Sequence, residues 1–327
     1  MLQRNILGFL GLCAALSVIG CSASEGANEC NTGADCTSGA CNAGRCVSAG
    51  VGGGAGQGGA GGGGGVGGQG GAAGVAGSTG GSAGTGSGGS GGTATCLPNN
   101  DGSIERAEVP IAAGLNAKFL VGLDAKVGTS GAKQSDGSRI WNLKAGLNGD
   151  HLVVVETQAP DKFWFAGKYP GATYVTRLSD SSELLGIFQL DAAKLSLIGV
   201  ASPTEGVTRT ELKYDPPVTT LAFPLTANKQ WTTTSTVTGV AQGVTVFYTE
   251  KYDFSIDAHG VAQTPFADFS VLRAASTLTR TVGLLTTTIR SFAFVTECFG
   301  TIATVTSNDN EPAVEFSQAK EIRRLSP

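Results

Sequence analysis

The sequence contains little of what catalysis usually requires. Its two histidines, His151 and His259, lie far apart, and neither has the spacing of a metal-binding motif. We expect His151 at the start of a strand and His259 in a turn over 257–260, where a histidine is usually solvated. Several carboxylates are also expected to be solvated: Glu211, Glu250, Asp253 and Asp257. The sequence therefore favours a protein that is not an enzyme, although a carboxylate pair placed for glycoside hydrolysis would be invisible at this level and keeps a carbohydrate-active hydrolase as an alternative.

A basic surface is missing as well. Charged residues make up 15% of the chain, its formal net charge is −4, and the one basic pair, Arg323 and Arg324, lies near Glu315 and Glu321. Nucleic-acid binding needs a basic patch, so no nucleic-acid partner is expected. A charged last strand is typical of a sheet edge, where charge prevents aggregation, and we expect it there.

One apolar run, at residues 6–19, follows Arg4 near the N-terminus. Its length of about 14 residues is shorter than the roughly 20 that span a bilayer as a helix, and it predicts a signal peptide over 1–20. The run ends in Val18-Ile19-Gly20-Cys21, which resembles the lipobox of bacterial lipoproteins. The resemblance implies that Cys21 is acylated and tethers the chain to a membrane, since two or more acyl chains hold a protein stably. An ordinary secretory signal with a cysteine near its end is the alternative.

The residue after Cys21 is Ser22 rather than aspartate. In lipoproteins of the enteric type this implies sorting to the outer membrane. The expected location is therefore the cell envelope, at the outer membrane, on either its periplasmic or its surface face.

The remaining cysteines support export. Cys13 lies in the signal peptide, and an even set of six follows Cys21: Cys30, Cys36, Cys41, Cys46, Cys96 and Cys298. In an oxidising compartment such a set predicts disulfides, and the spacing of the first four, with no histidine nearby, fits zinc poorly. We expect a Cys96–Cys298 bridge that closes the start of the last domain onto its final strands, with two buried free thiols as the alternative. The first four cysteines allow three connectivities.

Composition divides the exported chain into three parts. Residues 21–49 form a small cysteine-rich segment with almost no large apolar side chain. Residues 50–93 are nearly all Gly, Ala, Ser and Thr, which predicts a disordered linker whose root-mean-square span is roughly 35 Å. Residues 94–327 are long enough for one large or two small domains.

This last part is expected to be all-β. Runs that alternate with a period of two and are rich in Val, Thr, Phe and Ile occur at 117–127, 140–147, 151–156, 174–178, 184–190, 195–201, 231–240, 244–256, 266–280, 284–298, 301–306 and 314–325. Turn signals separate them, among them Asn148-Gly149, Asp136-Gly137, Pro216-Pro217, Ala227-Asn228 and His259-Gly260. Strands without intervening helices predict one antiparallel domain. Runs longer than ten residues favour a curved sheet, half-barrel or barrel, and a sandwich is the alternative.

Two features of this domain could bind something. Asn99, Asp101 and Glu108 are spaced like half of an EF-hand loop and are weak calcium candidates, but Leu97 occupies the first ligand position. The alternative is a turn at Asp101-Gly102 and a short helix capped by Ser103.

The second feature is the aromatic run 163–165 beside Asp161. It could stack against sugars, but packing in a core or at an edge is the favoured interpretation.

Several phrases occur together in this chain: 101–108 (DGSIERAE), 214–217 (YDPP), 223–225 (FPL) with Trp231, and 297–300 (ECFG). They resemble a set of uncharacterised myxobacterial lipoproteins over most of residues 96–327. The stretch 30–46 is similar to the small cysteine-rich modules of exported myxobacterial proteins. The resemblance implies lipid attachment and an all-β domain, and it brings no activity.

We therefore expect a membrane-tethered envelope lipoprotein whose β domain is a non-catalytic binding or structural module, with a protein, glycan or apolar molecule as the ligand. A periplasmic or surface carrier of a lipid or other apolar ligand is the first alternative, and a hydrolase is the second. The concave side of the sheet distinguishes them, because it would be a packed core, an apolar cavity or a cleft with convergent carboxylates.

The membrane tether can be tested at one residue. Cys21→Ser removes the acylation site, so an intact β domain is expected in the soluble fraction after cell fractionation. A variant that stays with the membrane would show that the lipid is not the anchor.

Overall fold

The computed structural model describes residues 41–42, 45–46 and 96–327. In its first part, strands β1 (Cys41–Asn42) and β2 (Arg45–Cys46) pair antiparallel, with Cys41 opposite Cys46. Cys21, Cys30, Cys36 and the predicted signal peptide lie outside the described residues. Among those that are described, no helix is long and apolar enough to cross a membrane.

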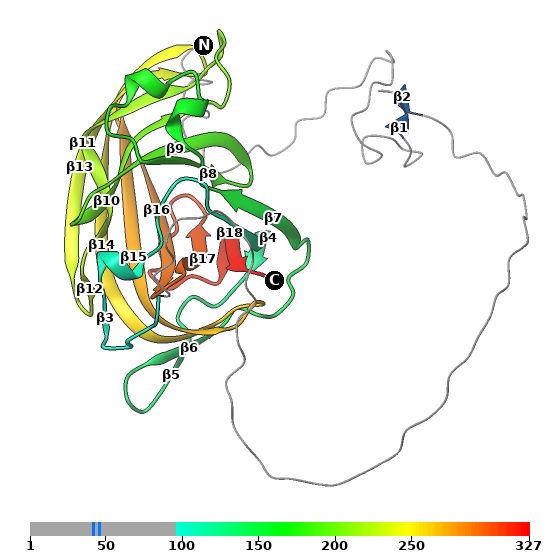
Figure 1. The fold of residues 1–327 in the computed structure, drawn as a ribbon, viewed down its shortest axis with the longest axis vertical. Helices are drawn as coiled ribbons and strands as arrows, with labels where there is room; N and C mark the ends of the chain where they lie inside the picture. Colours follow the sequence, from blue (N-terminus) through cyan, green and yellow to red (C-terminus); the bar gives the residue numbers. More distant parts are fainter. Residues whose placement is uncertain (1–40, 43–44, 47–95) are drawn as a thin grey trace, which may run out of the picture. The chain divides into compact units, whose positions relative to one another are not determined.

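The rest is built around one 14-stranded sheet (Figure 1). Its strands are β4 (Asn116–Lys126), β5 (Ala132–Lys133), β6 (Arg139–Asn142), β7 (His151–Glu156), β8 (Tyr174–Ser179), β9 (Ser182–Leu190), β10 (Lys194–Ala201), β11 (Glu211–Ala222), β13 (Gln230–Ala241), β14 (Val244–Gln263), β15 (Asp268–Val282), β16 (Leu285–Thr296), β17 (Gly300–Ser307) and β18 (Gln318–Leu325). The order is β7-β4-β18-β17-β16-β15-β14-β13-β11-β10-β9-β8, with β5 and β6 attached through β14. All pairs are antiparallel except β6 with β14. The expected antiparallel all-β domain is confirmed.

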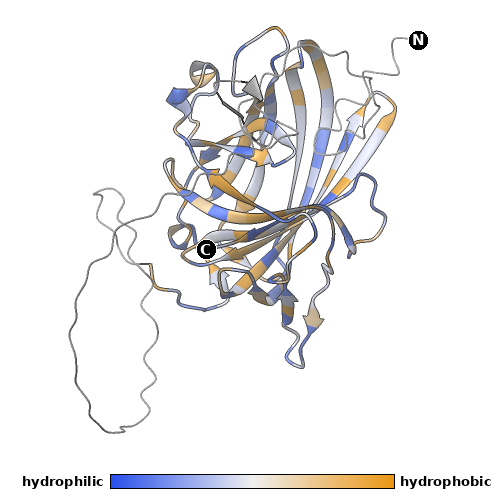
Figure 2. Cartoon of the chain, turned by 90° about the vertical axis from the view of Figure 1, so that its right-hand side faces the viewer, coloured by the Kyte–Doolittle hydropathy of each residue, from blue (hydrophilic) through white to orange (hydrophobic). Residues whose placement is uncertain are grey.

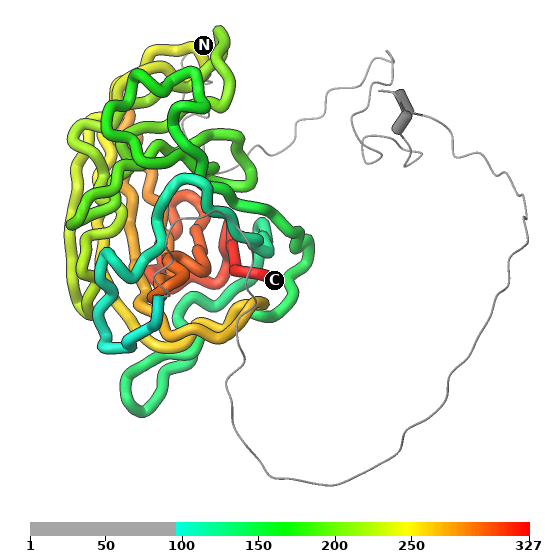
Figure 3. Tube along the Cα trace, in the orientation of Figure 1, coloured from blue at the N-terminus to red at the C-terminus, as the bar shows by residue number. Residues whose placement is uncertain are grey.

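The sheet curls until it is nearly a closed barrel rather than a sandwich. Its two ends, β7 and β8, approach each other and share one isolated bridge, Gln158 with Val175. The chain trace in Figure 3 shows the strands wrapping around a common interior. The described residues contain no α-helix, and short 3-10 helices lie at η2 (Arg106–Glu108), η3 (Pro160–Lys162) and η4 (Ala166–Lys168).

Strand β14 is longer than the sequence suggested. The predicted turn at His259-Gly260 is wrong, because both residues belong to β14 and pair with Leu272 and Val271 of β15. Gly260 has φ 150°, and a Cβ there would lie 1.9 Å from the carbonyl oxygen of Arg139 in β6. The glycine therefore allows a second strand to approach and does not end the first.

The predicted turn at Pro216-Pro217 is also wrong, since both prolines lie inside β11, a strand that the alternation missed. Strand β11 pairs with β10 at residues 211–213 and again at 218–222, with a register shift between these stretches. The prolines occupy that interruption, where a missing backbone donor breaks no ladder bond.

Outward-facing side chains are partly covered. Residues 127–147 and 316–319 pack with the outer side of β15–β18 around Trp141, Phe292 and Phe294. Residues 163–172 cover β8–β10 around Phe165 and Tyr169. Between these covers, outward positions such as Thr232, Thr234 and Thr238 are exposed, as expected for a solvated threonine face. Figure 2 shows hydrophobic and hydrophilic residues interspersed along the long strands of the sheet.

The last strand is not a sheet edge. β18 lies between β17 and β4, and Arg324 is buried, donating to the carbonyl of Ala145 and pairing with Asp150. The charge of Arg324 therefore stabilises the loop on the outer face that contains Ala145 and Asp150. The expectation that the charged last strand forms a sheet edge is wrong. The physical reason is that β4, from the start of the domain, adds beyond the last strand.

One end of the barrel interior is closed by the beginning of the domain. Strand β3 (Ser103–Ile104) pairs with β12 (Leu225–Thr226), and Ile104 and Leu225 pack with Ile256, Leu272 and other buried side chains. The expected disulfide is present between Cys96 and Cys298, which lies in the turn between β16 and β17. We call residues 96–108, together with β12, the plug. The disulfide attaches the plug to the barrel wall.

Removing the disulfide should destabilise the domain. The bridge closes a loop with a sequence separation of 202, for which the chain-entropy model gives about 5 kcal/mol as an upper value. Cys298→Ser and Cys96→Ser should lower the midpoint of urea unfolding by the same amount, because each removes the same bond. Wild type measured with a reductant is the control, and equal midpoints for all samples would contradict the prediction.

Candidate functional site

The barrel interior is the candidate site, and strand register decides which side chains reach it. In β14 alternate residues point inward, so Tyr248, Glu250 and Ile256 are buried, whereas Thr249 and Lys251 are exposed. Each inward residue faces an inward residue of the next strand, as Glu250 faces Arg280 of β15. The same alternation in neighbouring strands lines one continuous inner surface.

This inner surface encloses two cavities that share lining residues. The first, of about 250 Å³, lies between leucine and valine side chains of β8–β11 and Tyr248, Leu278 and Ile289 on the opposite wall. The second, of about 230 Å³, is lined mainly by small or hydroxyl side chains. Four residues belong to both linings: Leu178, Ser276, Ser291 and Thr306. The two cavities therefore adjoin each other at these four residues.

A polar network is buried in the wall of the first cavity. Glu250 is fully buried and accepts from Arg280 Nε at 2.6 Å and from the Tyr252 hydroxyl at 2.6 Å. Burial, and then the neighbouring tyrosines and the negative charge of Glu250, raise the pKa of Tyr252 and Tyr214 well above the ordinary tyrosine value. Burial opposes the charge on Arg280, but the ion pair with Glu250 outweighs it and raises the arginine pKa. The network is therefore an ion pair with neutral phenols beside it.

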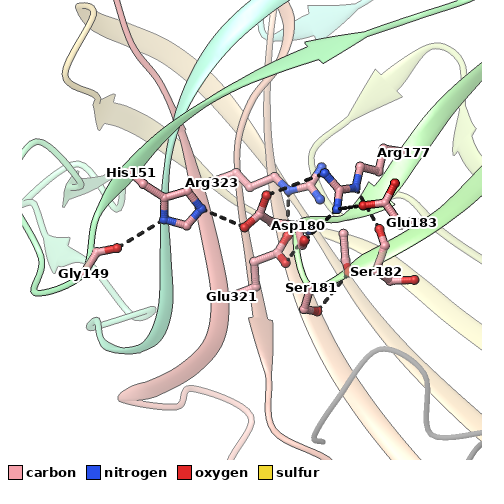
Figure 4. A network of polar contacts seen from close by, with 10 residues as sticks. Gly149, His151, Arg177, Asp180, Ser181, Ser182, Glu183, Glu321 and Arg323 are labelled. Atoms are coloured by element: carbon pink, nitrogen blue, oxygen red, sulfur yellow. Dashed lines mark hydrogen bonds and ion pairs between the residues drawn. The ribbon is translucent and has the colours of Figure 1, made fainter. Parts of the chain in front are cut away.

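A second network joins the two ends of the sheet (Figure 4). Asp180, in the turn between β8 and β9, accepts from His151 Nε2 of β7 at 2.7 Å. The Asp180 backbone amide donates to Glu321 of β18 at 2.9 Å, and Glu321 pairs with Arg323. Arg177 of β8 donates to the Asp180 carbonyl at 2.9 Å. Polar side chains thus hold the barrel closed where β7 and β8 share little backbone pairing.

We call the junction between β7 and β8 the seam, and a cavity lies there beside this network. It has a volume of about 240 Å³ and is lined by Val153, Gln158, Phe163 and Arg323 among others. Arg323 also lines the second interior cavity, so the seam and the interior meet at this side chain.

The calcium candidates lie together in the plug segment and bond to one another and to the backbone. Asn99 Nδ2 donates to Glu108 Oε1 at 2.7 Å, and Glu108 Oε2 accepts from the Glu105 backbone amide at 2.8 Å. Asp101 Oδ1 accepts from the Ser103 amide at 2.8 Å. The short helix of the alternative interpretation is present as η2, but its cap is Glu105 rather than Ser103, because Ser103 is taken up in β3.

The calcium assignment stays a prediction. Within residues 41–42, 45–46 and 96–327, no group of three His, Cys, Asp or Glu side chains is placed to hold a metal.

The other sequence candidates lie apart from the interior cavities. His259 borders a separate hollow of about 460 Å³ at the plugged end, where Asp136 accepts from Ser138 and Glu297 accepts from the amides of Asn99 and Asn100. These carboxylates are occupied by the protein itself.

The aromatic run 163–165 packs on the outer side of β8–β10, with Phe165 fully buried and Trp164 Nε1 donating to the Ser202 carbonyl. The favoured interpretation of these rings as packing residues is confirmed.

The expectation that the four strand and loop carboxylates are solvated is wrong for Glu250. Asp253 pairs with Lys251 at a position 42% exposed, Glu211 pairs with Lys168, and Asp257 pairs with buried Arg273. The alternation of residues along β14 is the one signal that could have indicated that Glu250 is buried. To use that signal, one must know which face of β14 lies inside the barrel. Arg280, Tyr214 and Tyr252 were missed for the same reason.

No protein-family model matches the sequence, and no curated protein matches it. Among solved structures, a Bacteroides fragilis protein described as exported and as having a YmcC-like fold aligns with a TM-score of 0.23 and 8% identity, over 70% of this chain and 96% of that one. A likeness at this level assigns no ligand or activity to the chain.

The seam network should make stability depend on pH. The hydrogen bond to Asp180, and then the Gly149 carbonyl, raise the pKa of His151 above its ordinary value of 6.5. A raised pKa means that the protonated imidazole stabilises the folded state below about pH 6.5, and that this stabilisation is lost as pH rises through the folded pKa. The difference in melting temperature between wild type and His151→Gln should therefore be larger at about pH 6 than at about pH 8.

The effect should stay below about 1 kcal/mol because the imidazole is partly exposed. Lys251→Gln, which breaks a surface pair elsewhere in the sheet, is the control and should show no such pH dependence. A constant difference between wild type and His151→Gln across this pH range would show that the pair does not stabilise the seam.

Proposed function

We propose that the chain is an exported lipoprotein, held at the outer membrane through acylated Cys21, and that its domain 94–327 binds a small amphipathic molecule inside the barrel. The observation that carries the proposal is the pair of adjoining interior cavities. Small inward side chains keep the second cavity open where larger ones would fill it, namely Ala274, Ser276, Ser291 and Ala293. Unfilled space costs packing energy, so a barrel with only a structural role would gain stability by filling it.

The lining suits a molecule with an apolar body and an uncharged hydrogen-bonding group. Leu197, Leu212 and Leu278 offer apolar surface in the first cavity. The charge of Arg280 is balanced by Glu250 within 2.6 Å, so a charged ligand group would find no unmatched countercharge there. Ser276 and Ser291 supply hydroxyls where the two cavities meet.

Export is supported by residues at both ends of the chain. The Cys96–Cys298 disulfide is of the kind that persists in an oxidising compartment. The apolar run 6–19 and Cys21 supply the signal and the tether. Together they favour the role of a binding module or carrier in the cell envelope.

A hydrolase is less well supported. In the part of the chain that the structure describes, two carboxylates reach the inner surface, and each is paired with an arginine: Glu250 with Arg280 and Glu321 with Arg323. Each carboxylate is thus engaged by the protein itself, whereas glycoside hydrolysis needs a pair of carboxylates that flank the substrate.

The proposal is tested by filling the cavity. Ser276→Leu places an isobutyl group where the two cavities meet and should weaken binding of the neutral fluorescent probe N-phenyl-1-naphthylamine at least about tenfold, because probe and side chain compete for one space. Binding is measured by fluorescence titration of the purified protein.

Thr279→Leu is the matched control, because it lies in the same strand and faces outward. It should bind the probe like wild type. Equal affinities for the two variants, or no probe binding by wild type, would argue against an interior ligand site.

A further inference from the structure

One end of the barrel carries a group of exposed apolar side chains. Leu284 is 101% exposed, Val207 90%, Phe247 76%, Leu285 53% and Val244 49%. They lie on the hairpin between β13 and β14, on the hairpin between β15 and β16, and in the loop between β10 and β11. We call these five residues the apolar rim.

Hydrogen bonds hold the three segments of the rim at one end of the sheet. The Gly243 amide in the β13–β14 turn donates to the Arg209 carbonyl at 3.0 Å, and the Gln242 amide donates to Thr210 Oγ1 at 3.2 Å. Thr249 of β14 pairs with Thr281 of β15, which places the β15–β16 hairpin beside the first residues of β14. The plug and the disulfide occupy the other end.

The rim carries almost no charge. Residues 241–249 and 281–289, which form the two hairpin tips, contain no Asp, Glu, Lys or Arg. The loop over 202–208 adds Glu205, and Arg209 follows with the opposite charge. Exposed Phe and Leu at tips without charge are costly in water and favourable in the interfacial layer of a bilayer.

The rim also lies beside the first cavity. Ala241, Gln242 and Thr210, which lie beside it, line the first cavity together with Leu278 and Ile289 of the second hairpin. An apolar molecule that left the cavity on this side would therefore meet apolar side chains.

We propose that the apolar rim docks onto the surface of a lipid bilayer and turns this end of the barrel towards it. Seventy-four residues separate Cys21 from Cys96, which is enough chain for the domain to reach the membrane in any orientation. A bilayer accounts for the rim better than a protein partner, because the tips offer apolar surface without the polar pattern that orients a protein interface. The docking goes beyond ligand binding and does not require that the cavity be filled.

The test uses the mature chain with Cys21→Ser, so that no acyl group contributes, and vesicles of pure phosphatidylcholine. At high lipid concentration this protein should co-sediment with the vesicles, but reversibly, so that it leaves them on dilution and is soluble after cell fractionation. Phe247→Asp with Leu284→Asp should lower the partition coefficient at least about tenfold. Leu97→Asp is the matched control, since Leu97 is 79% exposed and adjoins Cys96 at the plugged end. It should bind like the parent protein.

Because the rim is uncharged, binding should be the same at about 0.05 M and about 0.5 M salt. Binding that needs anionic lipid or disappears at high salt would overturn the proposal in favour of a charged surface. A rim-dependent dimer that does not bind vesicles, detected by analytical ultracentrifugation, would overturn it in favour of a second copy of this chain.

Two further measurements test whether the rim inserts into the bilayer and whether it acts independently of the interior cavity. Phe247→Trp should become quenched by brominated phosphatidylcholine beyond the quenching of the three native tryptophans, and no added quenching would contradict insertion. The Asp variants should still bind the naphthylamine probe, and Ser276→Leu should still bind vesicles. Failure of the interior site and failure of the rim are thereby distinguished.

Discussion

The antiparallel hydrogen-bond ladder from β7 round to β8 is the constraint on which the rest of this structure depends. Because each strand presents alternate side chains to opposite faces, the ladder sends Glu250 and Tyr248 inward and Thr249 and Lys251 outward with one choice of register. The curl of the same ladder produces the interior. Cavity, plug and rim are all consequences of which residues this register places inside and at the ends.

Buried charges are held in ion pairs both inside the barrel and on its outer face. Inside, Glu250 is satisfied by Arg280 and Tyr252; outside, Arg273 lies beneath the covering loops and is held by Asp257 and Glu315. Such groups contribute little net stability, but breaking one partner leaves a buried charge. They therefore fix the position of the walls and covers more than they strengthen the fold.

The all-β class, most strands and the Cys96–Cys298 bridge could be predicted from the sequence, because alternation and cysteine number are local or countable. The interior site could not, since burial of Glu250 depends on which of two faces curls inward, and this is a property of the whole sheet. Misassigned turns share one cause: Gly260 and Pro216 look like breakers, yet each serves a strand, one by admitting β6 and the other by occupying a register shift.

The barrel is closed differently at the seam between β7 and β8 than between its other neighbouring strands. Elsewhere the circumference is held by continuous backbone pairing, but here it is closed by one bridge, Gln158 with Val175, and by the contacts of Asp180. Closure of the barrel at this point therefore depends on a few polar contacts instead of a continuous backbone ladder. A substitution at one of these side chains would therefore act on the junction of the two sheet ends and leave every other strand pair intact.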